Sequence, residues 1–127
     1  MTEYSEILKD INIQIYADGA DLEEMRIVRE QGYVSGFTTN PTLMKKAGVT
    51  DYFEFAKHAI KIADGLPISF EVFTDDIEEM VEQASTLNAL GDNIYVKIPV
   101  MNTKGQMTYP IIERLDKMGV NLNVTAV

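Results

Sequence analysis

Segments with the features of β-strands alternate with helix-like segments along the whole 127-residue sequence. The strand-like segments lie at residues 11–17, 33–38, 67–73, 93–98 and 120–127. Between them, apolar residues recur three or four positions apart, which is typical of amphipathic helices. This alternation predicts parallel strands joined by right-handed helical crossovers. No linker or low-complexity tract divides the chain, so we expect residues 1–127 to belong to one domain.

The strand-like segments carry apolar side chains on one face and polar side chains on the other. In residues 93–98, for example, Ile94, Val96 and Ile98 alternate with Asn93, Tyr95 and Lys97. Strands of an open, doubly wound sheet are covered by helices on both faces and are apolar on both. Strands of a closed (β/α) barrel face helices on one side only. The pattern favours the barrel and leaves the open sheet as the alternative.

The spacing of the strands sets the size of the expected barrel. Successive strand centres lie about 27 residues apart, so eight units would need roughly 220 residues, near the short end for a (β/α)8 TIM barrel. The sequence ends on an apolar strand-like segment, residues 120–127. We therefore expect the chain to cover about the first five β/α units and to be truncated after them.

Composition narrows the class of function. The formal net charge is −9, which argues against a nucleic-acid-binding protein because such proteins need a basic face. The chain has no cysteine, and its single histidine, His58, cannot form a multi-histidine zinc site. The N-terminus lacks the features of a signal peptide, and no apolar run approaches the ~18 residues of a membrane span. We expect a soluble, cytoplasmic protein without a membrane or nucleic-acid partner.

Polar residues follow the strand-like segments at the ends where barrel enzymes carry their catalytic groups. These residues are Asp18, Thr39 and Asn40, Glu71, Lys97 and Thr125. A lysine inside a barrel must be paired or must have a lowered pKa, because burying an ammonium group is costly. A neutral lysine attacks carbonyls and forms a Schiff base. The alternative for Lys97 is an internal salt bridge to Glu71 or Asp18.

The other polar residues also have two interpretations each. Asp18 is a candidate general acid/base, or a residue of the Asp18–Gly19 turn that caps the next helix. Glu71 is a candidate for proton transfer through a water held by Thr125, or the partner of Lys97 in a salt bridge. Asn40, with Thr39, is a candidate for binding a substrate hydroxyl, whereas Asn40 before a proline is also a good helix N-cap.

Five sequence blocks, in order along nearly the whole chain, resemble the transaldolase family, particularly its small single-barrel bacterial branch. These blocks are Tyr16-Ala-Asp-Gly-Ala-Asp-Leu-Glu-Glu24, Gly36-Phe-Thr-Thr-Asn-Pro-Thr-Leu43, Ser69-Phe-Glu-Val72, Val96-Lys-Ile-Pro99 and Asn121-Leu-Asn-Val-Thr-Ala-Val127. The resemblance implies a Schiff-base lysine at Lys97 and a general acid/base at Asp18. It further implies that Asn40 contacts a substrate hydroxyl and that Glu71 and Thr125 activate a catalytic water. Asn123 matches a polar position beside that site.

The same resemblance implies the activity. It is expected to be transfer of a dihydroxyacetone unit between sugar phosphates in the pentose phosphate pathway, with no metal or organic cofactor. The fructose-6-phosphate aldolase branch tends to carry glutamine where this chain has Glu71, so glutamate favours transaldolase. An aldolase and a catalytically incompetent half-barrel are the alternatives. The family also implies a ring-like homo-oligomer.

The sequence departs from the family pattern in two places. Family members usually carry threonine where this chain has Gly19 after the strand-one aspartate. The family's phosphate-binding serine and arginines lie beyond the fifth strand, and nothing in residues 1–127 corresponds to them. We therefore expect this chain to carry the carbonyl-reacting part of the site without the phosphate-binding part.

Overall fold

The computed structural model describes Ile7, Asp10 and residues 12–126, within which five parallel strands form one sheet in chain order. The strands are β1 (Tyr16–Asp18), β2 (Gly36–Thr38), β3 (Ile68–Glu71), β4 (Ile94–Pro99) and β5 (Leu122–Thr125). An open doubly wound sheet reverses its strand order at a switch point, and this sheet does not. The sequential order is that of consecutive (β/α) barrel units. Most of the amphipathic stretch at residues 4–10 lies outside the described residues.

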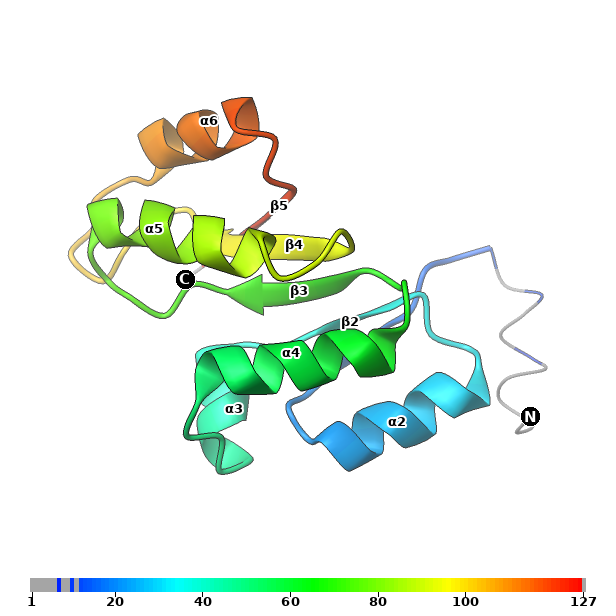
Figure 1. Cartoon of the computed structure of the whole chain (residues 1–127). Helices are drawn as coiled ribbons and strands as arrows, with labels where there is room; N and C mark the ends of the chain where they lie inside the picture. The colour runs from blue at the N-terminus through cyan, green and yellow to red at the C-terminus, as the bar shows by residue number, and fades with distance from the viewer. Residues whose placement is uncertain (1–6, 8–9, 11, 127) are drawn as a thin grey trace.

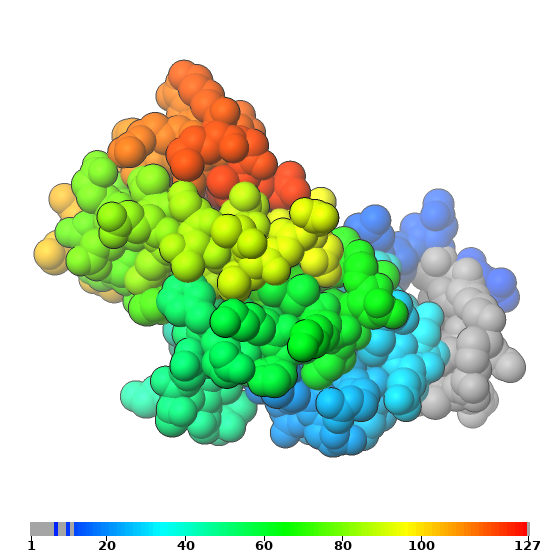
Figure 2. Space-filling view, in the orientation of Figure 1, coloured from blue at the N-terminus to red at the C-terminus, as the bar shows by residue number. Residues whose placement is uncertain are grey.

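The helices follow the strands and lie in succession along one side of the sheet (Figure 1). They are α2 (Leu22–Gln31), α3 (Pro41–Lys46), α4 (Tyr52–Ala63), α5 (Ile77–Asn88) and α6 (Tyr109–Lys117). In the space-filling view, segments that are consecutive in the sequence lie next to one another, from the blue and cyan segments to the orange one (Figure 2). None of the helices in the described part of the chain is long and apolar enough to cross a membrane.

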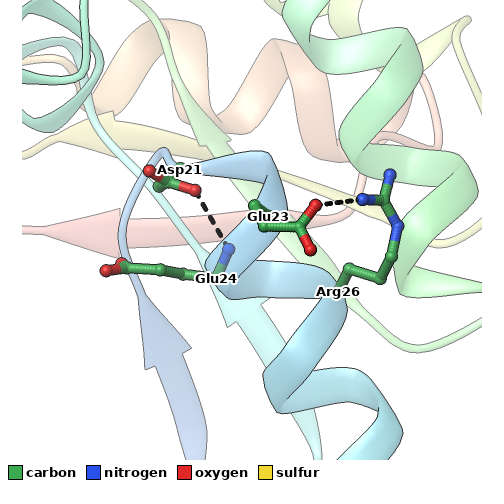
Figure 3. A network of polar contacts seen from close by, with 4 residues as sticks. All are labelled: Asp21, Glu23, Glu24 and Arg26. Carbon is green, nitrogen blue, oxygen red and sulfur yellow. Dashed lines mark hydrogen bonds and ion pairs between the residues drawn. The ribbon is translucent and has the colours of Figure 1, made fainter.

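Four of these helices begin at a side chain that accepts a hydrogen bond from the backbone N–H three residues later. These N-cap residues are Asp21, Asn40, Asp51 and Asp76. Figure 3 shows the cap of α2, where Asp21 Oδ1 lies 3.0 Å from the N–H of Glu24. An exposed ion pair between Glu23 and Arg26 follows it and adds little to stability. Three of these caps, at Asp21, Asn40 and Asp76, fix where a helix begins after the end of a strand.

The apolar faces of the central strands form the core, as the sequence pattern predicts. Phe70 on β3 and Val96 and Ile98 on β4 are fully buried against the helices. Met80 and Leu87 of α5 lie in the same core. Burial of a single large apolar side chain contributes about 1.5–3 kcal/mol to stability. The register of the sheet is thereby tied to the alternation, because a slip by one residue would expose this face.

The two outer strands are shorter and less covered than the sequence predicts. The first strand is predicted at residues 11–17 but begins at Tyr16, and Ile13 is 63% exposed. Val124 of β5, predicted to face helices, is 47% exposed. Each of these strands is hydrogen-bonded to a neighbour on one side only, so its apolar face meets fewer helices. The prediction of a helix-covered apolar face is wrong for these positions.

Gly36 at the start of β2 allows a close approach that a larger residue would prevent. A Cβ atom at this position would lie 2.6 Å from the carbonyl oxygen of Pro67 and 2.7 Å from the ring of Tyr16. Tyr16 is the first residue of β1, and Pro67 directly precedes β3. The carbonyl of Pro67 accepts a hydrogen bond from the N–H of Phe37. The close packing of β1, β2 and β3 therefore requires glycine here.

We expect Gly36→Ala to lower the free energy of unfolding by about 1–3 kcal/mol, as is usual for overpacking. Urea denaturation of both proteins measures the difference. Placing Gly36→Ala in a Tyr16→Ala background should recover only part of the loss, because the contact with the Pro67 carbonyl stays. A Gly36→Ala protein as stable as the parent chain would contradict the close approach.

Candidate active site

A row of polar side chains crosses the sheet on the face opposite the core. The parallel register pairs Asp18 with Thr38, Thr38 with Ser69, and Glu71 with Lys97. Lys97 is in turn paired with Asn123 of β5. Residues paired in this way point to the same face, so the polar positions of all five strands share one surface. The predicted polar face is confirmed by this register.

One hydrogen bond on this face indicates that the sheet is concave there. Asn123 Nδ2 donates to Ser69 Oγ over 3.4 Å, although β5 and β3 are separated by β4. Strands two places apart in a flat sheet lie about 10 Å from each other. Contact between short side chains across an intervening strand is expected on the inner side of a curving sheet. The polar face is therefore the interior side of a barrel wall.

A cleft of about 750 Å3 opens at the carboxyl ends of the strands. Its walls come from the start of α3, the segments that follow β3 and β4, and the end of β5. Four of the predicted site residues, namely Asn40, Glu71, Lys97 and Thr125, line it together. These residues lie up to 85 positions apart in the sequence, and only the fold brings them to one place. Enzymes with a (β/α) barrel fold carry their active sites at the carboxyl ends of the barrel strands.

Lys97 and Glu71 are neighbours in this cleft without a direct bond. No ion pair or hydrogen bond joins the two side chains in the described part of the chain, so the salt-bridge interpretation of Lys97 has no contact to support it. Partial burial raises the pKa of Glu71, and the positive charge of Lys97 lowers it by a smaller amount. A carboxyl group with a raised pKa keeps its proton to a higher pH than an ordinary glutamate does, which is a common property of groups that transfer protons.

Asn40 caps a helix, as its position before a proline predicts, and it also lines the cleft. Its Oδ1 accepts a hydrogen bond from the backbone N–H of Leu43 over 2.9 Å and caps α3. Its Nδ2 donates to no other described residue, and Asn40 lines the cleft. The cap fixes the side chain, and the amide group stays available for a ligand hydroxyl.

Asp18 lies at the end of β1, on the polar face but outside the large cleft. It lines a separate, smaller hollow of about 60 Å3 near the start of α2. The cap of α2 is Asp21, not Asp18, so the capping interpretation of Asp18 is wrong. The side chain of Asp18 makes no hydrogen bond or ion pair with the described residues and is exposed.

Thr39 and Asn123, both predicted to bind substrate, lie in different settings. Thr39 is 2% exposed, does not line the cleft, and its hydroxyl makes no hydrogen bond with the described residues. The neighbouring Thr38 is the threonine that shares the polar face with Asp18 and Ser69. Asn123 lies on that face beside Lys97. Ser69 lies on the polar side of its strand, as the alternation predicts, whereas Thr38 was not predicted as a residue of this face.

The rim of the cleft near Lys97 is an ordered loop held by two polar side chains. Asn102 accepts hydrogen bonds from the N–H groups of Lys104 and Gln106 at 3.0 and 2.9 Å, and donates to the carbonyl of Asp75. Asp75 in turn accepts from the N–H and the hydroxyl of Thr103 at 2.9 and 2.6 Å. These bonds from Thr103 lower the pKa of Asp75. The loop after β4 is therefore fixed to the loop after β3, and both walls of the cleft are held in place.

The lining of the cleft carries few charges. Among the described residues that line it, Lys97 is the only cation, and Glu71 and Asp75 are the acidic groups. No three histidine, aspartate or glutamate side chains within the described ranges gather as metal ligands would. Lys97 is therefore the one cationic contact that the described lining offers to a ligand.

Comparison with known proteins identifies relatives of the chain over most of its length. The family model described as "Transaldolase/Fructose-6-phosphate aldolase" matches residues 15–127. Proteins described as "Probable transaldolase" from Maridesulfovibrio salexigens, Thermoanaerobacter sp. and Thermoplasma volcanium are 37%, 38% and 39% identical to it. Each match covers 91% of this chain and 51%, 50% and 50% of the relative, respectively. The chain spans about half the length of the curated relatives it matches.

The raised pKa of Glu71 predicts a pH-dependent effect on stability. A carboxyl group whose pKa is raised by folding stabilises the folded state fully below its unfolded pKa and loses that contribution as the pH rises. Glu71→Gln removes the charged form, so we expect the variant to gain stability relative to the parent between about pH 4 and pH 7. Urea denaturation across this range measures the gain, with Glu82→Gln as the control for loss of an exposed carboxylate. A gain that shrinks with rising pH would contradict the assigned direction.

Proposed function

The chain belongs to the transaldolase/fructose-6-phosphate aldolase family, and on that premise we propose that it carries the Schiff-base site of a transaldolase. The observation that supports this most directly is the cleft in which Lys97, Glu71, Asn40 and Thr125 meet. The substrate is a ketose phosphate, and the reaction transfers its dihydroxyacetone unit to an aldose phosphate. We also propose that residues 1–127 are the N-terminal part of a single barrel domain.

Lys97 is the proposed nucleophile. Its neutral Nζ attacks the C2 carbonyl carbon of the ketose to give a carbinolamine, which loses water to form an iminium ion. When the C3–C4 bond breaks, its electron pair moves into the iminium and gives an enamine on Lys97. The enamine then adds to the aldehyde of the acceptor, and hydrolysis of the new iminium releases the product ketose. Because the iminium accepts the electron pair, the reaction needs no further electron sink.

Asp18 is the proposed general acid/base. The C4 hydroxyl must lose its proton as the C3–C4 bond breaks, because this carbon becomes the aldehyde of the leaving aldose. An unpaired carboxylate on the same face of the sheet as Lys97 is suited to accepting it. The same group returns the proton when the acceptor aldehyde becomes a hydroxyl. Asp18 lines a different hollow from Lys97, and it is the strand register that places both residues on the same face of the sheet.

Glu71 and Thr125 are the proposed partners in the steps that involve water. Carbinolamine formation and dehydration each move a proton, and Glu71, whose pKa is raised by partial burial, is the carboxyl group beside Lys97 that can donate and accept it. Thr125 lines the same cleft and has a hydroxyl that can both donate to and accept from a water. A water held between the two groups would pass the proton to the oxygen that leaves C2.

Asn40 and Asn123 are the proposed substrate-binding residues. The Nδ2 group of Asn40 would donate to a substrate hydroxyl, and Asn123 lies beside Lys97 on the polar face. Thr39 is left outside these contacts because its hydroxyl is buried away from the cleft. Lys97 is the only cation in the lining, so we propose that the substrate phosphate is bound by groups outside the cleft lining described here.

The second candidate is a fructose-6-phosphate aldolase, which shares the lysine intermediate and the family model. An aldolase releases free dihydroxyacetone, whereas a transaldolase retains the unit until an acceptor arrives. The aldolase branch tends to carry glutamine at the position of Glu71, so the glutamate in this chain favours the transaldolase. Cytoplasmic localisation, the pentose phosphate pathway and a homo-oligomeric assembly stay predictions.

Borohydride reduction in the presence of fructose 6-phosphate tests the lysine directly. We expect a stable adduct of a three-carbon or six-carbon unit on Lys97, found by mass spectrometry of tryptic peptides. Lys97→Arg keeps the positive charge but forms no Schiff base, so it should give no adduct. Lys61→Arg replaces an exposed lysine of α4 and should leave the adduct unchanged.

The probable transaldolase of Thermoplasma volcanium provides a positive control for the same reaction conditions. If that protein is trapped and the folded 127-residue chain is not, the chain lacks the proposed Schiff-base activity. An adduct that survives Lys97→Arg would assign the reaction to another lysine. Release of free dihydroxyacetone without an acceptor aldose would favour the aldolase over the transaldolase.

A further inference from the structure

The hydrogen-bond ladder between β2 and β3 has no backbone donor at the end that carries Glu71. Along the ladder, the N–H of Phe37 donates to the carbonyl of Pro67, and the N–H of Thr39 donates to the carbonyl of Ser69. The next bond in this series would run from residue 41 to the carbonyl of Glu71. Residue 41 is proline, which has no N–H. The carbonyl of Glu71 must therefore find its donor elsewhere.

The hydroxyl of Tyr52 supplies that donor. Tyr52 is the first residue of α4, and its hydroxyl donates to the carbonyl oxygen of Glu71 over 2.5 Å. The side chain reaches Glu71 from a different element, since 19 positions separate the two residues in the sequence. On the other side of Glu71, the N–H of Val72 donates to the carbonyl of Lys97. The backbone around Glu71 is thereby fixed between α4 and β4.

The ring of Tyr52 is held in a cluster of aromatic side chains. Its centroid lies 4.9 Å from that of Phe73, 5.7 Å from that of Phe53 and 6.4 Å from that of Phe70. Separations of this size are typical of favourable aromatic pairs. Two of these neighbours, Phe70 and Phe73, flank Glu71 on either side in the sequence. The cluster therefore fixes the direction of the hydroxyl as well as the position of the ring.

We propose that Tyr52 is a positioning residue for Glu71, which completes the end of β3 through its backbone carbonyl and so holds the Glu71 side chain in the cleft. This role rests on the proposed function for its chemical purpose, because Glu71 is the proposed proton-transfer group. Tyr52 does not line the cleft and contacts no reacting atom. It acts on the reaction through the backbone of Glu71.

The titration behaviour of both residues agrees with their contact. Burial raises the pKa of Tyr52, and the charge of Glu71 raises it further, so its hydroxyl stays protonated and remains a donor. Lys97 on β4 is the cation that acts on Glu71, and Asp75 is the other acidic group in the cleft lining. If the end of β3 loosens, Glu71 gains access to water. Its pKa then falls toward the ordinary value, since partial burial is the main cause of the rise.

Tyr52→Phe tests the proposal in the 127-residue chain, because it removes the hydroxyl and keeps the ring. We expect the pKa of Glu71, followed by NMR of its carboxyl carbon, to fall toward the ordinary value for glutamate. The amide of Thr39, in the next rung of the ladder, should exchange with solvent roughly 3- to 10-fold faster, as expected for loss of one hydrogen bond. An unchanged Glu71 titration together with unchanged Thr39 exchange would overturn the proposal.

Tyr33→Phe is the matched control. Tyr33 is also a partly buried tyrosine packed against the core, and no hydrogen bond of its hydroxyl to another described residue accompanies that packing. The same chemical change at Tyr33 should leave both readouts at the parent values. A Tyr33→Phe protein that shifts Glu71 equally would show a general loosening of the core and would contradict a specific role for Tyr52.

A measurement on the parent chain covers the case in which Tyr52→Phe fails to fold. Tyrosine labelled with 13C at Cζ shows two signals in mixed light and heavy water when its hydroxyl proton exchanges slowly. We expect two signals for Tyr52 and one averaged signal for the exposed Tyr109. A single averaged signal for Tyr52 would overturn the hydrogen bond itself.

These outcomes are independent of the Schiff-base test. If Lys97 gives no borohydride adduct but Glu71 responds to Tyr52→Phe, the proposed function fails and the positioning role stands. If Lys97 is trapped but the pKa of Glu71 and the amide exchange of Thr39 do not change in Tyr52→Phe, the function stands and the positioning role fails. Neither experiment uses the variants of the other.

Discussion

The register between β3 and β4 determines the whole arrangement of the polar face. Glu71 and Lys97 are paired across these strands because Phe70, Val96 and Ile98 are buried on the opposite face. A slip of one residue would move Lys97 into the core and expose the apolar side chains. Hydrophobic burial on one side of the sheet therefore places the charged groups on the other side. The candidate chemistry depends on a register that the core enforces.

The ends of the same strands are held by side chains because regular backbone pairing stops there. Proline at position 41 ends the β2–β3 ladder, and the Tyr52 hydroxyl takes the place of the missing donor at Glu71. Asn102 and Asp75 likewise supply side-chain partners for backbone groups in the loops after β3 and β4. Where regular pairing stops, backbone N–H and C=O groups lose their partners in the sheet. Hydrogen bonds from side chains of neighbouring elements replace those partners and also fix the walls of the cleft.

The sequence predicted the types of the elements and their order, because period-two and helical periodicities alternate clearly. The lengths of the outer strands were less predictable, since exposure of Ile13 depends on which helices reach β1. Among the site residues, Asn40, Glu71, Lys97 and Thr125 do share one cleft. The role of Tyr52 depends on a contact between distant elements, for which a single sequence has no local signal. The cap at Asp21, by contrast, has one in the glutamate three positions later.

The central claim is that Lys97 reacts with a ketose inside the cleft that Glu71, Asn40 and Thr125 line. A crystal structure of the chain after borohydride trapping with fructose 6-phosphate tests it most directly. We expect continuous electron density from Lys97 Nζ to the C2 atom of the sugar, with Glu71 and Asn40 within hydrogen-bonding distance of the trapped unit. Density for the sugar on a lysine outside the cleft, with Lys97 unmodified, would contradict the claim.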